Sequence, residues 1–183
     1  MPVVKPDKSI RINSGYSSEI YNPRKLIRDA KKILNHGEIQ FRERSDGRWG
    51  DVEVSAPEFD TIVGTGLSGT LHLTRLATAL DCNWLAIRKK NDSNHADELP
   101  EGLLGRKWIF FDDFIGVGST FQRVARAVTD IAEKRDFETE FVGAYLYSSK
   151  KKLYPLSILP ELVRLPSFLA YERGYNYKAY DKI

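Results

Sequence analysis

Four short apolar runs, separated by helical patterns and glycine turns, constrain the fold of this chain most strongly. They read DTIVG at 60–64, NWLAIR at 83–88, KWIFFDD at 107–113 and EFVGAYLY at 140–147. Runs that are apolar almost throughout are typical of parallel strands whose two faces are both covered. Amphipathic helix patterns follow the first and the third run, so we predict an open doubly wound parallel α/β sheet over about residues 59–147.

Residues 1–58 precede the predicted core and show one helix and one strand. The helix pattern occupies 22–36, where Asn22 suits the N-cap and Pro23 the first helical position. The run EIQFRER at 38–44 indicates a strand, and we expect the polar stretch after it, SDGRWGD, to be a turn.

Residues 148–183 follow the core and combine a lysine run with three prolines and many aromatic residues. Proline at this density interrupts regular elements, so we predict an irregular segment that packs on the core. The chain is therefore divided into the segments 1–58, 59–147 and 148–183.

Composition restricts the class of protein. With 183 residues, of which 42% are hydrophobic and 29% charged, the chain fits one ordinary globular domain. No apolar run approaches the roughly 20 residues of a membrane span, and the first residues, MPVVKPDKSIRINSG, lack the apolar region of a signal peptide, so we expect a cytoplasmic protein without a membrane partner. The net charge of +3 is too small to indicate a stable nucleic-acid partner. Cys82 is the single cysteine, which excludes an internal disulfide, and the three histidines lack metal-ligand spacing.

The run IFFDDFIGVGST at 109–120 carries the clearest chemical pattern. Its strand ends in two adjacent carboxylates, Asp112 and Asp113, and glycine and hydroxyl residues then lead directly into a helix. The free N–H groups and the positive dipole end of that helix favour a phosphate. The two carboxylates can accept hydrogen bonds from a diol and hold a hydrated metal ion. A ribose 5-phosphate carries a phosphate and a diol, so it is a ligand that this pattern predicts.

A second glycine loop, GTGLSG at 64–69, follows the first core strand and opens a helix. It matches the dinucleotide-binding spacing G-x-G-x-x-G. The next core strand ends in cations, at Arg88, Lys89 and Lys90, where an NAD-binding domain would carry an acid for the ribose. Arginine at that place suits NADP, so an NADP-binding oxidoreductase remains an alternative.

The motif at 108–120 resembles the binding loop of the type I phosphoribosyltransferases. These enzymes transfer ribose 5-phosphate from phosphoribosyl pyrophosphate (PRPP) to a nitrogenous base with Mg²⁺. The resemblance covers about residues 59–147, and it departs at Gly116 and Val117, where the family often has threonines. It implies a Mg²⁺-dependent phosphoribosyltransferase that acts on a nucleobase-like acceptor, commonly as a homodimer. A PRPP-binding regulator without an acceptor pocket is the alternative among relatives of the family.

The resemblance also assigns roles to the residues of both loops. Asp112 and Asp113 would bind the ribose hydroxyls, directly or through waters of Mg²⁺. The 5-phosphate would lie in the loop formed by Ile115, Gly116, Val117, Gly118, Ser119 and Thr120. The pyrophosphate would lie against Thr65, Gly66, Leu67, Ser68 and Gly69. Arg88, Lys89 and Lys90 would oppose the charge of the leaving group.

The polar stretch 91–105 follows these cations and corresponds to a flexible flap in the family. His95 lies in it and is a candidate catalytic contact to pyrophosphate. The order R-K-x-x-x-x-x-H is similar to the start of the flap in the orotate enzymes, but Asp92 stands where they have a second lysine, which argues against orotate. The choice of base in the family depends on a variable hood, a small part of the chain that covers the base. We expect the N-terminal segment, the C-terminal segment or both to form this hood.

Overall fold

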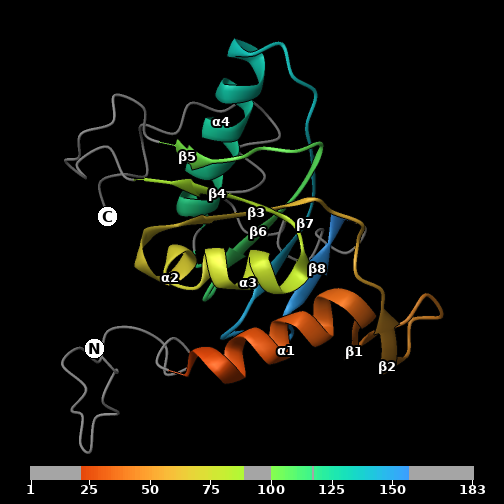
Figure 1. Cartoon of the computed structure of the whole chain (residues 1–183). Helices are drawn as coiled ribbons and strands as arrows, with labels where there is room; N and C mark the ends of the chain where they lie inside the picture. The colour runs from red at the N-terminus through yellow and green to blue at the C-terminus, as the bar shows by residue number, and fades with distance from the viewer. Residues whose placement is uncertain (1–21, 89–99, 117, 157–183) are drawn as a thin grey trace, which may run out of the picture.

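A six-stranded sheet with helices on both faces forms the body of the molecule (Figure 1). The computed structural model describes residues 22–88, 100–116 and 118–156. The strand order is β5-β4-β3-β6-β7-β8, in which the four inner strands are parallel and each outer strand is antiparallel to its neighbour. The strands are β3 (Thr61–Thr65), β4 (Asn83–Ile87), β5 (Pro100–Gly102), β6 (Lys107–Asp112), β7 (Glu140–Leu146) and β8 (Leu153–Pro155). The predicted doubly wound parallel core is confirmed, with a short antiparallel strand at each edge.

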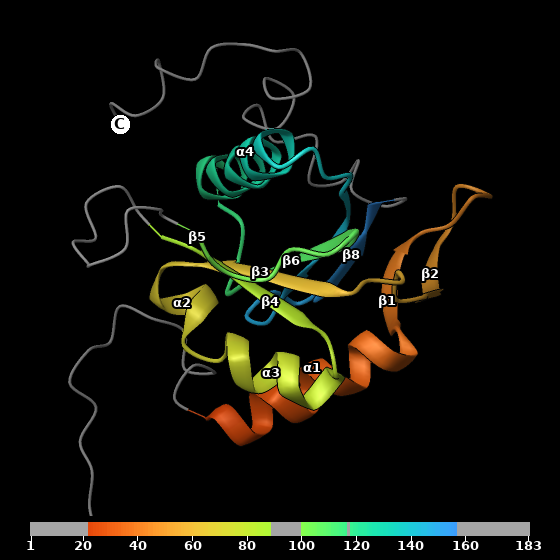
Figure 2. The same cartoon turned by 45° about the horizontal axis from the view of Figure 1, so that its top comes forward.

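Side chains of the inner strands alternate between two cores, one on each face of the sheet. The helices are α1 (Pro23–His36), α2 (Gly66–Thr70), α3 (Leu73–Leu80) and α4 (Ser119–Lys134). The first three cover one face and α4 covers the other (Figure 2). In β6, Ile109 and Phe111 pack with α1 and α3, whereas Phe110 packs with α4.

Helix α1 begins and ends where the sequence pattern predicts. The side chain of Asn22 accepts a hydrogen bond from the Lys25 N–H at 3.3 Å, and Pro23 occupies the first turn. Gly37 ends the helix with a φ of 81°, a left-handed conformation that favours glycine. A Cβ on Gly37 would lie 2.4 Å from the carbonyl oxygen of Val54, so only glycine lets the next strands pass this close to the helix end.

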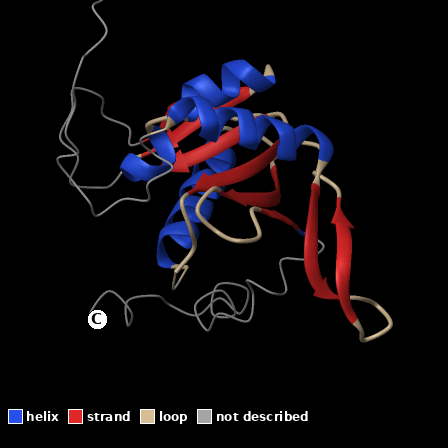
Figure 3. Ribbon diagram, turned by 90° about the horizontal axis from the view of Figure 1, so that it is seen from below, coloured by secondary structure: helices blue, strands red, loops and turns tan. Residues whose placement is uncertain are grey.

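An antiparallel hairpin, β1 (Glu38–Glu43) and β2 (Trp49–Val54), follows α1 and projects from the body (Figure 3). β1 confirms the predicted strand. The prediction of a turn over 45–51 was wrong in its second half, because Trp49 to Asp51 are strand residues. Six cross-strand pairs, beginning with Glu43 and Trp49, hold this stretch extended despite its turn-forming residues.

The segment after residue 147 is not wholly irregular, because it contains β8. Leu153 is fully buried, and the N–H of Leu146 donates to the Lys152 carbonyl at 2.8 Å. The chain therefore turns back at once and pairs with β7. The proposed division at 147 stays a prediction.

Some predictions concern residues outside the described part of the chain. They include the predicted site residues Lys89, Lys90, His95 and Val117, and all of 157–183. Of the flap predicted at 91–105, the structure describes only the last six residues, which contain the edge strand β5. Among the helices within the described ranges, none combines the length and the apolar composition needed to cross a membrane.

Candidate active site

Both glycine loops and the acid pair line one cavity of about 370 Å³ at the C-terminal ends of the parallel strands. Strands β3 and β6 are neighbours in the sheet, so the loops that follow them begin side by side. Open α/β sheets bind their ligands at this edge. The first loop contributes Thr65, Gly66, Leu67 and Ser68. The second contributes Asp112, Asp113, Phe114, Ile115, Gly116, Gly118, Ser119 and Thr120.

Glycines let the first loop pack its backbone directly on the sheet. A Cβ on Gly64 would lie 2.2 Å from the carbonyl oxygen of Gly69. A Cβ on Gly69 would in turn lie 2.9 Å from the carbonyl oxygen of Phe111 in β6. The loop therefore lies tight against β3 and β6, which brings Ser68 within reach of the acid pair.

A hydrogen bond joins the two loops. The hydroxyl of Ser68 donates to Oδ1 of Asp112 at 2.5 Å, and the N–H of Asp113 donates to the same oxygen at 2.9 Å. The Tyr147 hydroxyl donates to the carbonyl of Ser68 at 3.2 Å and fixes the loop from the β7 side. Asp112 is only 5% exposed, whereas its partners Ser68 and Asp113 are half-buried.

This burial raises the pKa of Asp112 to about 7, from an ordinary 3.8. The hydrogen bonds from Ser68 and the Asp113 N–H lower this pKa and the charge of Asp113 raises it, and the value of about 7 is the net result. Asp112 is therefore present in both protonated and ionised forms near neutral pH. A cation or a hydroxyl-bearing ligand beside the pair would favour the ionised form.

The two residues that follow strand β7 fix the backbone of the acid pair. The carbonyl oxygens of Asp112 and Asp113 accept hydrogen bonds from the N–H groups of Tyr147 and Ser148 at 3.0 and 2.9 Å. The Asp113 side chain is partly exposed and accepts the Phe114 N–H at 2.9 Å. Both carboxylates thus line the cavity, with Asp112 buried in its wall and Asp113 partly exposed.

The N-terminus of α4 forms another part of the cavity wall. Its N-cap is Gly118, which has a left-handed φ of 81° and no side chain to cap the helix. Ser119 and Thr120 occupy the first two helical positions and are exposed. The N-cap thus supplies no side-chain acceptor to the first-turn N–H groups, which is the arrangement an anion requires.

Arg123 is a site-supporting residue that the sequence analysis did not identify. From the second turn of α4 its guanidinium donates to the Thr65 hydroxyl at 2.6 Å and to the Arg88 carbonyl at 3.2 Å. The Thr65 hydroxyl donates onward to the carbonyl of Ile87 at 2.5 Å. Arg123 therefore ties α4 to the ends of β3 and β4, although in the sequence it reads as one more polar residue of an amphipathic helix.

Two of the predicted site residues, Gly69 and Arg88, do not line the cavity. Gly69 is buried under the first loop. Arg88 forms an ion pair with Glu101 of β5 at 3.3 Å, and 15% of its side chain is exposed. Its predicted contact with pyrophosphate stays a prediction, as do those of Lys89, Lys90 and His95.

A wider depression of about 1080 Å³ lies at the opposite edge, where β3 and β4 begin. Its wall includes the half-buried Cys82, where burial raises the pKa of the thiol to about 11 and keeps it protonated. A protonated thiol is a poor nucleophile. The smaller cavity holds the acid pair and the helix N-terminus, so we assign function there.

The described residues contain no group of three or more His, Cys, Asp or Glu side chains arranged to hold a metal ion. Asp112 and Asp113 are a pair of oxygen donors. Mg²⁺ is commonly bound by one or two carboxylates together with substrate phosphates and water. The donor set therefore fits a magnesium ion that arrives with a phosphorylated ligand.

The chain is similar along most of its length to orotate phosphoribosyltransferases, although no protein-family model matches it. It is 23% identical to the Malacoplasma penetrans enzyme over 167 residues, which are 90% of this chain and 74% of the relative. It is 25% identical to the Streptococcus pneumoniae enzyme over 184 aligned residues, 94% of this chain and 81% of the relative. The predicted resemblance to the phosphoribosyltransferase family is thereby confirmed.

Among solved structures, an adenine phosphoribosyltransferase from Thermoanaerobacter pseudethanolicus matches with a TM-score of 0.40 and 14% identity. The match covers 87% of this chain and 79% of that one. An orotate phosphoribosyltransferase from Mycobacterium tuberculosis H37Rv matches with a TM-score of 0.35 and 15% identity, over 68% of this chain and 82% of that one.

Proposed function

We propose that this chain, which resembles the phosphoribosyltransferases, transfers ribose 5-phosphate from PRPP to a nucleobase-like acceptor and releases pyrophosphate. The hydrogen bond between Ser68 and Asp112 carries the proposal, because it fastens the loop assigned to pyrophosphate onto the acid pair assigned to ribose. Both loops and the start of α4 then face one cavity of about 370 Å³, within the size range of small-molecule sites.

Each part of the cavity wall has a role in the reaction. The bond between ribose C1 and a pyrophosphate oxygen breaks, the bond between C1 and an acceptor nitrogen forms, and the electron pair leaves with pyrophosphate. The backbone N–H groups of the first loop stabilise the negative charge that builds on the leaving group. The N-terminus of α4 binds the 5-phosphate. Asp112 and Asp113 accept hydrogen bonds from the ribose hydroxyls and favour the positive charge that builds at C1.

Magnesium would supply the largest positive charge beside the leaving group. Asp112 and Asp113 would hold it through water, and the phosphates of PRPP would complete its oxygen shell. The same positive charge would lower the pKa of Asp112 and keep its carboxylate ionised during the reaction. In the absence of the ion, Ser68 provides the main side-chain contact to that carboxylate.

Phe114 and Leu67 form the acceptor side in this proposal. Both line the cavity, and 59% and 49% of their surfaces are exposed, so a ligand in the cavity can contact them. A Cβ on Gly116 would lie 3.5 Å from the Phe114 ring, so the ring lies over the phosphate-binding loop. An aromatic ring in this position can stack on a flat heterocyclic acceptor.

Orotate is the first acceptor to test, because the similar enzymes carry its name. The sequence argues against orotate at position 92, where this chain has Asp92 and the orotate enzymes have a lysine. The hood also stays a prediction. The hairpin shares no residue with the wall of the cavity, so we place the base-covering residues in 1–21, in 157–183 or in a second copy of the chain.

A panel of acceptors tests the proposal. Orotate, adenine, guanine, hypoxanthine, xanthine, uracil and nicotinamide are each supplied with PRPP and Mg²⁺, and pyrophosphate release is measured. Release with one base, abolished by EDTA, is the expected result. PRPP binding without release for any base would instead indicate a regulator. Absence of PRPP binding, together with a change in NADPH fluorescence, would indicate an oxidoreductase.

A further inference from the structure

The hairpin exposes an apolar and acidic face. Ile39, Phe41 and Trp49 are 72%, 61% and 64% exposed, and the rings of Phe41 and Trp49 lie 6.0 Å apart. Residues directly opposite in an antiparallel pair point to the same side. Each apolar residue stands opposite an acid, in the pairs Ile39 with Glu53, Phe41 with Asp51, and Trp49 with Glu43. These six residues, called the hairpin face below, contain three exposed carboxylates and no cation.

The opposite side of the hairpin is fixed to the body of the molecule. Gln40 Nε2 donates to the Leu153 carbonyl at 2.7 Å, and a Glu38 carboxylate oxygen accepts the N–H groups of Lys152 and Leu153, both at 2.9 Å. The hairpin face is therefore held outward in a defined orientation. Two aromatic rings and an isoleucine exposed together on one rigid face indicate a protein interaction site.

Helix α1 carries a surface of opposite character. Its solvent side, opposite the buried Leu26, Ala30 and Leu34, exposes five cations and no large apolar residue. These cations, called the α1 face below, are Arg24, Lys25, Arg28, Lys31 and Lys32. With Asp29 as its one acid, the helix has more net positive charge than the whole chain, which has +3.

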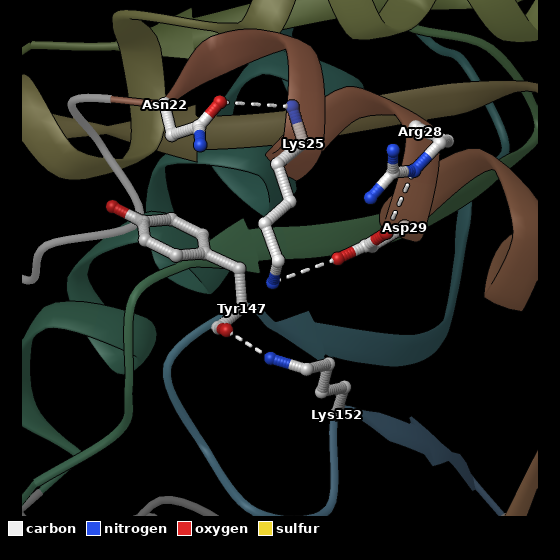
Figure 4. Close-up of polar contacts among 6 residues, drawn as sticks. All are labelled: Asn22, Lys25, Arg28, Asp29, Tyr147 and Lys152. Atoms are coloured by element: carbon white, nitrogen blue, oxygen red, sulfur yellow. Dashed lines mark hydrogen bonds and ion pairs between the residues drawn. The ribbon is translucent and has the colours of Figure 1, made fainter.

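Internal pairing offsets only part of the α1 face. Lys25 and Arg28 share the carboxylate of Asp29, at 3.1 and 3.3 Å (Figure 4). Within the described ranges, Lys31 and Lys32 have no ion-pair partner. These cations are thus available to a second surface that carries carboxylates.

The two surfaces match in length, charge and chemistry. The α1 face from Arg24 to Lys32 is about 12 Å long at 1.5 Å per residue. The hairpin face from Ile39 to Glu43 is about 14 Å long at 3.4 Å per residue. Its carboxylates suit the cations of α1, and its rings offer faces for cation–π contacts. Contact between two hairpin faces, or between two α1 faces, would instead bring like charges together.

We infer that the hairpin face of one copy docks on the α1 face of a second copy, and that two such contacts form a twofold dimer. Both surfaces are exposed within one copy, so a second copy is needed to bring them together. A twofold axis makes the contact reciprocal, because each copy supplies one hairpin face and one α1 face. The inference uses no residue of the proposed active site.

Charge reversal with rescue tests this pairing. Sedimentation velocity compares the full wild-type chain with three variants. The first carries Lys31→Glu and Lys32→Glu, the second carries Asp51→Lys and Glu53→Lys, and the third carries all four changes. We expect a dimer that weakens as salt increases. Each double reversal should raise the dimer dissociation constant about tenfold or more. The fourfold variant should return to within about threefold of wild type, because the exchanged charges again attract.

Matched controls separate this contact from general effects of charge. Reversal of two exposed lysines outside both faces, Lys134→Glu with Lys150→Glu, should leave the dimer unchanged. If a charge-reversed variant fails to fold, Phe41→Thr with Trp49→Thr tests the same face without altering charge and should also weaken the dimer. A monomeric wild type, a dimer that neither reversal weakens, or a fourfold variant that stays dissociated would each overturn the inference.

Discussion

Replacement of Asp112 by asparagine should stabilise the fold at high pH while it removes the proposed activity. Asp112 is buried, and its ionised form is disfavoured in the ligand-free protein, which raises its pKa to about 7. Asparagine keeps an oxygen that accepts hydrogen bonds from Ser68 and from the Asp113 N–H, but it has no proton to lose. The variant therefore removes the cost of a buried charge and retains the local hydrogen bonds.

The magnitude follows from proton linkage. The pKa of Asp112 is higher in the folded state, at about 7, than its ordinary 3.8, so between these pH values the folded state holds a proton that the unfolded chain has lost. The stability contributed by this proton is complete below about pH 4 and is lost as the pH rises through about 7. From pH 5 to pH 9 the loss covers about two pH units, or about 3 kcal/mol at 1.36 kcal/mol per unit.

Urea unfolding at pH 5, 7 and 9 and constant ionic strength measures this loss. Wild type should lose about 3 kcal/mol more than Asp112→Asn between pH 5 and pH 9, since all other titrating groups are common to both proteins. The buried carboxylate would then be a feature that costs stability in return for ligand binding. Parallel pH profiles for the two proteins would refute the reasoning.

Three further variants test individual parts of the site. Ser68→Ala removes a donor that lowers the pKa of Asp112, so the acid limb of the kcat/KM profile should move to higher pH and PRPP affinity should fall about tenfold. An acid limb at the wild-type pH would contradict the contact between Ser68 and Asp112. Arg123→Gln should raise the KM for PRPP about tenfold with little change in kcat, because the first loop loses its support; an equal loss in the matched variant Arg126→Gln would show a general helix effect. Phe114→Ala should raise the acceptor KM about tenfold and leave PRPP affinity within about twofold, as expected for a lost stacking contact. A fall in PRPP affinity alone would show that the ring contacts PRPP rather than the acceptor.

The central strands and their loops could be predicted because local sequence determines them. The runs that became β3, β6 and β7 are buried on both faces over most of their length, and burial on both faces leaves a nearly continuous apolar pattern. The run that became β4 is half-buried to buried. Glycine at 64–69 and at 116–118 marked the turns that follow. The rule that parallel strands end at one edge then places the loop of Ser68 and the loop of Asp112 on the same side of the sheet.

Features that depend on distant contacts could not be predicted. The strand residues Trp49 to Asp51 resemble a turn, and only pairing with β1 keeps them extended. Strand β8 has three residues and ends in proline, so no local pattern identifies it. Arg123 looks like a solvent-facing residue of α4, because the neighbour that gives it a role, Thr65, lies 58 residues earlier in the chain.

Calorimetric titration with PRPP and Mg²⁺ tests most directly whether the two loops and the acid pair form one binding site. Wild type is compared with Asp112→Asn combined with Asp113→Asn, and with a control that neutralises two exposed acids of α4, Asp130→Asn with Glu133→Gln. Wild type and the control should bind PRPP with equal affinity. The first variant should remain folded and bind at least about 100-fold more weakly, because it loses two charge-assisted contacts. Undiminished binding in that folded variant would contradict the account.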